Sequence, residues 1–182
     1  MDLNKYLIII IDTCINKGVS MENISQSSLW KILNRLIGRW KSEVKGKAGL
    51  GKGSREYSKI LQGNYLFCTN KAIFEPQDQN PKGEVHEDWG FFNYNSLEDT
   101  IKLRVFYSEG YVSLYALEKF SLKDNEFVFV TIDNDNLPKG FRARLTTCFL
   151  SNESFSEKFE LASPKEDFDM CITNIWHKES KF

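Results

Sequence analysis

Two histidines are the first residues to consider for chemistry, because imidazole is a common metal ligand and acid–base group. They are His86 and His177, in a chain of 182 residues. His86 and Asp88 are two positions apart, which places both side chains on one face of a strand. Two histidines and scattered carboxylates nevertheless give no ligand spacing that is typical of a metal site.

Four arginines, at positions 55, 104, 142 and 144, are the next candidates, since a guanidinium can hold an anion in a bidentate geometry. An arginine inside a protein is costly unless it meets a carboxylate. That carboxylate could belong to a bound ligand or to Glu56, Glu87 or Asp88 of the chain itself. The sequence leaves three roles open, namely anion binding, structural ion pairs and solvent-facing positions.

The sequence gives no indication of nucleophilic catalysis, since it contains no recognisable Ser-His-Asp or Cys-His set and no nucleophile-elbow motif. Glu87 and Asp88 are adjacent, so in a strand they point to opposite faces and cannot act as a paired acid and base. The residues therefore favour a binding protein over an enzyme, and they leave open whether any reaction is catalysed.

Two loops are similar to ion-binding motifs but depart from them at decisive positions. Residues 46–53 approach a phosphate-binding loop, but Gly53 stands where a hydroxyl is needed and a strand follows instead of a helix. Residues 133–136 begin like a calcium loop, but Leu137 occupies a ligand position. We interpret the first as a hairpin at a barrel mouth and the second as a turn.

Composition narrows the class of partner. Lys+Arg 24 against Asp+Glu 25 leaves a net charge of -1, so neither a nucleic acid nor an anionic membrane is indicated. The four cysteines form no CxxC pair and are expected to be reduced and mostly buried. The apolar run Leu7–Ile11 is too short for a membrane span and makes a poor signal peptide. We therefore expect a cytoplasmic protein.

Local patterns divide the chain into an N-terminal extension, residues 1–24, and one domain, residues 25–182. The extension favours a helix, with a strand as the alternative. Leu29, Leu33, Leu36 and Ile37 predict a helix of about three turns that Gly38 ends. Ten strands are predicted after it, at 39–46, 53–61, 65–74, 85–94, 100–107, 111–120, 126–132, 140–150, 154–162 and 168–177.

These strands predict a mainly β fold. No helical pattern separates them, which excludes parallel βαβ units and favours an antiparallel up-and-down order. Free edges would expose unpaired backbone groups, so we expect the ten strands to close into a barrel. In residues 101–107, Ile101, Leu103, Val105 and Tyr107 share one face, and in residues 141–149 the odd-numbered residues do the same.

Several motifs carry a family resemblance. Gly38-x-Trp40 after a helix, residues 53–57, residues 80–90 and residues 109–112 resemble a bacterial group of lipocalin-like β-barrels in the calycin superfamily. The layout is more distantly similar to nitrobindin, a ten-stranded calycin barrel that holds haem through a histidine near its C-terminal end. The resemblance implies a closed barrel with an internal site, in which Trp40 packs at the closed end against an arginine from a late strand, here Arg142 or Arg144.

Three hypotheses follow. The first is a barrel that binds a small hydrophobic or amphipathic molecule, with Arg104, Arg142 or Arg144 as polar contacts. The second is a haem protein with His177 as axial ligand, as the nitrobindin likeness implies. The third is a barrel filled by its own side chains. Under the first hypothesis, the lining or floor residues are Trp40, Trp89, Phe91, Phe106, Tyr115 and Phe149.

Overall fold

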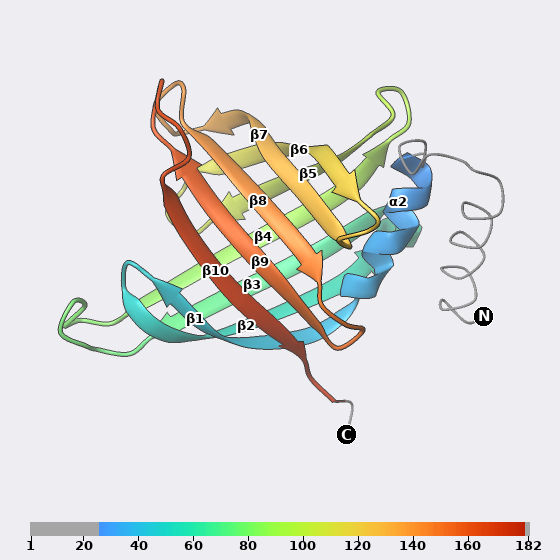
Figure 1. The fold of residues 1–182 in the computed structure, drawn as a ribbon. Coiled ribbons are helices and arrows are strands. Elements are labelled where there is room, and N and C mark those ends of the chain that lie inside the picture. The colour runs from blue at the N-terminus through green and yellow to red at the C-terminus, as the bar shows by residue number, and fades with distance from the viewer. Residues whose placement is uncertain (1–25, 181–182) are drawn as a thin grey trace.

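The computed structural model describes residues 26–180, which form a closed antiparallel barrel with a helix at one end (Figure 1). Each strand pairs with its neighbours in the chain, and the last strand returns to the first. This confirms the predicted fold class, whereas the predicted extension, residues 1–24, lies outside the described residues. The elements are α2 (Gln26–Ile32), η2 (Leu33–Leu36), β1 (Gly38–Gly46), β2 (Gly49–Ile60), η3 (Leu61–Gly63), β3 (Tyr65–Phe74), β4 (Glu84–Asn95), β5 (Thr100–Tyr107), β6 (Val112–Ser121), β7 (Glu126–Asp135), β8 (Arg142–Phe149), β9 (Ser154–Ala162) and β10 (Met170–Lys178).

The helix closes one end of the barrel because its apolar face has nowhere else to be buried. Leu29, Leu33 and Leu36 are all nearly inaccessible to solvent, and α2 contacts β4 and β5. The final turn of the predicted helix is a 3-10 turn, η2, after which the chain extends. Gly38 has φ +130°, a conformation that residues with a side chain rarely adopt, so it is the joint between helix and strand. None of the helical segments within residues 26–180 has the length and hydropathy of a bilayer-spanning helix.

Trp40 fastens the helix to the barrel. Its side chain is buried, its indole Nε1 donates to the carbonyl oxygen of Leu36 at 2.6 Å, and its ring meets Phe155 edge-on at 4.8 Å. The cation beside the ring is Lys178, whose Nζ lies 5.2 Å from the ring centroid. Trp40 therefore lies between the helical segment and β9 at that end of the barrel.

The predicted arginine partner of Trp40 is wrong. Arg142 and Arg144 both lie near Phe168, which follows β9, at the far end of the barrel. The arginine at the closed end is Arg35 of η2, which stacks on Phe149 at 4.2 Å. The cation beside Trp40 therefore comes from a late strand, β10, but it is Lys178 and not an arginine.

The seam between β1 and β10 is the shortest backbone ladder of the barrel. It pairs Trp40 with Lys178 and Lys41 with His177. Farther along the two strands, hydrogen bonds between a side chain and the facing backbone replace the backbone ladder. Ser42 Oγ donates to the Ile175 carbonyl at 2.7 Å, and the Lys45 amide donates to Asn174 Oδ1 at 3.0 Å. Closure at this seam therefore depends on side chains as well as on backbone pairing.

We predict that Trp40→Phe lowers the free energy of unfolding by about 2 kcal/mol, because it leaves a small void and removes the donor to Leu36. Urea unfolding monitored by circular dichroism measures this change. Trp89→Phe is the matched control, since Trp89 is 57% exposed on the outer wall, and it should change stability by less than about 0.5 kcal/mol. Equal effects of the two substitutions would contradict the fastening role of Trp40.

Candidate functional site

A cavity of about 440 Å³ lies inside the barrel and reaches the end opposite α2, where the β1–β2 and β5–β6 turns contribute to its lining. One part of the wall is apolar because the strands turn their apolar alternate residues inward. The other part is polar and runs across β2, β3 and β4, with one residue from β9. The apolar wall includes Val44, Ala72, Phe74, Phe92, Leu103, Val105, Leu145, Phe159, Leu161 and Ile172.

The polar wall is centred on a buried ion pair between Arg55 of β2 and Glu157 of β9. The guanidinium is bidentate, with Nη1–Oε2 at 2.6 Å and Nη2–Oε1 at 2.8 Å. The two side chains are 9% and 12% exposed. Arg55 also donates to Tyr57 and Asn70 and lies 4.2 Å above the ring of Trp176. Burial works against the charge of Arg55, but the charge of Glu157 raises its pKa above the usual range.

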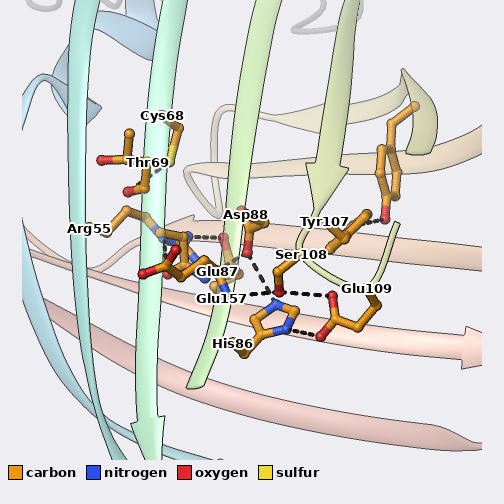
Figure 2. A network of polar contacts seen from close by, with 12 residues as sticks. Arg55, Cys68, Thr69, His86, Glu87, Asp88, Tyr107, Ser108, Glu109 and Glu157 are labelled. Carbon is orange, nitrogen blue, oxygen red and sulfur yellow. Dashed lines mark hydrogen bonds and ion pairs between the residues drawn. The ribbon is translucent and has the colours of Figure 1, made fainter. Parts of the chain in front are cut away.

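The network continues through Asp88 and His86 to Glu109 (Figure 2). Asn70 Nδ2 donates to Asp88 Oδ2 at 2.7 Å, and the same oxygen lies 3.3 Å from His86 Nε2. His86 Nδ1 lies 2.6 Å from Glu109 Oε1 in the β5–β6 turn. The hydrogen bond to Asp88 raises the pKa of His86, burial opposes it, and Glu109 raises it further, to about 9. His86 is therefore protonated at neutral pH, with both ring nitrogens donating to carboxylates.

Tyrosines extend the polar lining on β5 and β6. The hydroxyls of Tyr107 and Tyr115 are 3.0 Å apart, and the ring of Tyr107 stacks on Tyr111 at 4.3 Å. Burial raises the pKa of both Tyr111 and Tyr115 to about 12. Burial likewise raises the pKa of Cys68 to about 12, so this thiol is not a nucleophile at neutral pH. These groups offer hydrogen bonds and aromatic surface rather than a nucleophile.

Most of the side chains predicted to line the interior lie on the outer wall. Arg104 is exposed, and Arg142 bonds the Glu166 carbonyl outside the barrel. Arg144 pairs with Glu160 at 2.6 Å on the outer face, and this hydrogen bond lowers the pKa of Glu160 to about 2. These three arginines face outward because the alternate residues of their strands, such as Leu103 and Leu145, take the interior positions. The expectation that they contact an internal ligand is corrected accordingly.

The predicted aromatic residues divide between the two faces. Trp89, Phe91 and Phe106 form a row on the outer wall with Phe67, so their predicted interior position is also wrong. Tyr115 does line the cavity. Phe149 is buried at the closed end, where it packs against other rings as part of the floor.

His177 does not fit the axial position of an internal haem. It is exposed on β10, where the neighbouring Trp176 takes the inward position. His86 does line the cavity, but both of its nitrogens are engaged by carboxylates. Within residues 26–180, no group of His, Cys, Asp and Glu side chains is arranged to hold a metal ion. The described residues therefore provide no site for the predicted haem ligation.

Several residues of the cavity are not found by motif search. Glu157, Asn70 and Trp176 belong to no motif, although Glu157 stands among the apolar residues of β9. A charged residue at an otherwise apolar alternate position indicates a buried partner. Trp176 has a further feature, since its buried indole Nε1 donates to no group among the residues that the structure describes.

A second hollow, of about 360 Å³, lies mainly on the outer wall over β1 to β4. Its charged residues pair with one another, as Arg39 with Glu56 at 3.2 Å and Lys71 with Glu87 at 2.6 Å. These four side chains are about half exposed or more, so solvent screens them. The interior cavity is the better candidate because its polar groups are buried and fixed.

Comparison with known proteins supports the fold. The chain matches no protein-family model and no curated protein. Among solved structures it is similar to Rv2717c from M. tuberculosis, with a TM-score of 0.59 and 10% identity over 82% of this chain and 96% of that chain. The likeness is one of fold, a closed antiparallel β-barrel. A redesigned β-barrel, b11L5F_LGL, aligns with a TM-score of 0.39 and 12% identity over 88% of this chain and 100% of that chain.

We predict that Glu157→Gln destabilises the barrel by about 3 kcal/mol, because it leaves the buried Arg55 without a counter-charge. Urea unfolding measures the loss. Glu56→Gln is the control, since Glu56 belongs to an exposed pair and its loss should cost less than about 1 kcal/mol. Replacing both partners, as Arg55→Met with Glu157→Leu, should recover much of the stability. A Glu157→Gln variant as stable as the control would refute the structural role of the pair.

We also predict that His86 titrates near pH 9, which the pH dependence of its imidazole proton resonances measures directly. In the His177→Gln variant His86 is the remaining histidine, so its resonances can be assigned without ambiguity. Because the pKa of His86 is raised on folding from about 6.5, its stabilising contribution is complete below that pH and is lost as the pH rises through about 9. His86→Gln should remove this loss. A measured pKa at or below the unfolded value would contradict the two carboxylate contacts.

Proposed function

We propose that this protein binds a small, largely apolar molecule inside its barrel. The observation that carries the proposal is the interior cavity of about 440 Å³. Ligand pockets in proteins begin at roughly 300 Å³ and combine a mainly apolar wall with a few fixed polar groups. The cavity volume also favours a ligand-binding barrel over one that is filled by its own side chains.

The polar wall supports binding because its side chains hold one another in place. Arg55, Asn70, Asp88 and His86 hold one another through hydrogen bonds of 2.7–3.3 Å. Their side chains need little rearrangement when a ligand enters, so the entropy lost on binding is small. The ligand class is therefore a compact molecule with a large apolar part and a small polar part.

The test uses N-phenyl-1-naphthylamine, a neutral dye whose fluorescence rises in apolar surroundings. We predict saturable binding to the wild-type protein. Ala72→Phe places a ring in the cavity, because Ala72 is buried in its lining, and should weaken dye binding at least about tenfold. Absence of saturable binding to the wild type would contradict the proposal.

Two control variants separate the interior from the outer wall. Ile73→Phe adds the same ring at the neighbouring position, where the side chain is 39% exposed, and should leave dye binding unchanged. Trp89→Ala removes the most exposed ring of the outer aromatic row and should also have no effect. Loss of binding in Trp89→Ala with retention in Ala72→Phe would place the dye on the outer wall and overturn the proposal.

A further inference from the structure

Both cations inside the cavity already have carboxylate partners. Glu157 engages two nitrogens of Arg55, while Asp88 and Glu109 engage the two nitrogens of His86. A ligand carboxylate would have to displace one of these partners. Displacing Glu157 would leave a carboxylate that is only 12% exposed without its counter-charge, at a large cost. The interior therefore lacks the free arginine with which a barrel holds a fatty-acid carboxylate.

The cavity wall offers an unused acceptor instead. Asp88 lines the cavity with a side chain that is 15% exposed. Its Oδ2 receives the contacts from Asn70 and His86, whereas its Oδ1 accepts no hydrogen bond from the residues that the structure describes. A carboxylate oxygen in a confined site is stabilised most by a hydrogen-bond donor of the ligand. The stabilisation is greater when that donor carries a positive charge.

The rings of the lining favour a donor on the ligand, and its charges do not favour an anion. Among the charged lining groups that are not exposed, Arg55 and His86 are matched by Glu157 and Asp88, so no surplus of positive charge attracts a carboxylate. The other charged lining residues are exposed at the rim, where water screens them; these are Lys45, Lys47, Glu84 and Glu109. The stacked rings of Tyr107 and Tyr111 add aromatic faces that attract cations.

We propose that the cavity selects apolar molecules that carry a hydrogen-bond donor, an amine or a hydroxyl, over those that carry a carboxylate, with Asp88 Oδ1 as the acceptor. This proposal rests on the proposed function, since it requires a ligand inside the barrel. It specifies the polar part of that ligand, which the cavity volume alone does not.

Competition among decylamine, decanol and decanoate tests the selection, because the three share one chain length and differ in the polar group. Each displaces the bound dye at neutral pH. We expect decylamine or decanol to bind at least about tenfold more tightly than decanoate. If decylamine binds more tightly than decanol, the preferred ligand carries a charged donor. If decanol binds more tightly, the preferred donor is neutral. Decanoate binding as tightly as the other two would overturn the proposal.

A matched pair of variants tests the role of Asp88. Asp88→Asn keeps the shape and removes the charge, and it should reduce the preference for decylamine over decanoate about tenfold. Glu87→Gln makes the same change at the adjacent residue, which faces outward and pairs with Lys71, and it should leave the preference unchanged. An unchanged preference in Asp88→Asn would overturn the assignment.

The two proposals fail in different ways. If the wild-type protein binds neither the dye nor any decyl compound, the proposed function fails, and the selection fails with it. If the dye binds in the interior but decanoate is preferred, only the selection fails. Melting curves of each variant, monitored by circular dichroism, establish that the comparison is between folded proteins.

Discussion

The buried pair between Arg55 and Glu157 is the interaction on which the rest of the barrel depends. The two residues come from β2 and β9, the strands that flank β1 and β10. The backbone ladder between β1 and β10 is short, and the ion pair spans this seam from inside the barrel. Trp176 of β10 lies directly beneath the guanidinium. One charged contact thus joins three of the four strands around the closure.

This pair also determines what the cavity can bind. Two charges can remain in an apolar interior only if each satisfies the other, so the arginine that closes the barrel cannot also hold an anionic ligand. His86 is constrained in the same way by Asp88 and Glu109. What remains for a ligand is an apolar wall, tyrosine rings, the indole N–H of Trp176 and an unused carboxylate oxygen. The ion pairs that stabilise the barrel are therefore also the reason why the cavity does not favour a carboxylate ligand.

Much of the fold can be predicted from local sequence patterns, because strands alternate strictly and turns have a typical composition. The strand ends agree closely with the predicted ranges for β3, β5 and β9. The predicted alternation of β5 is also correct, since Ile101, Leu103 and Val105 share one face and are all buried. The main departure is in β2, which begins at Gly49 rather than residue 53, because a glycine-rich stretch carries little strand signal.

The candidate site is less predictable because it depends on pairing across the closed barrel. Arg55 and Glu157 are 102 positions apart, and no local pattern joins them. The alternation of β8 places Arg144 and Leu145 on opposite faces, but alternation alone does not say which face lines a cavity. The partner of Trp40 was missed for a related reason, since Lys178 reaches it only after β10 returns to β1.

The most direct test of ligand binding in the interior is the response of the indole N–H resonances of the four tryptophans during titration with decanol. Trp176 lines the cavity and its N–H has no partner within residues 26–180, whereas Trp89 is 57% exposed on the outer wall. We predict a saturable shift of the Trp176 resonance while that of Trp89 stays in place. A saturable shift of Trp89 with no change at Trp176 would contradict it.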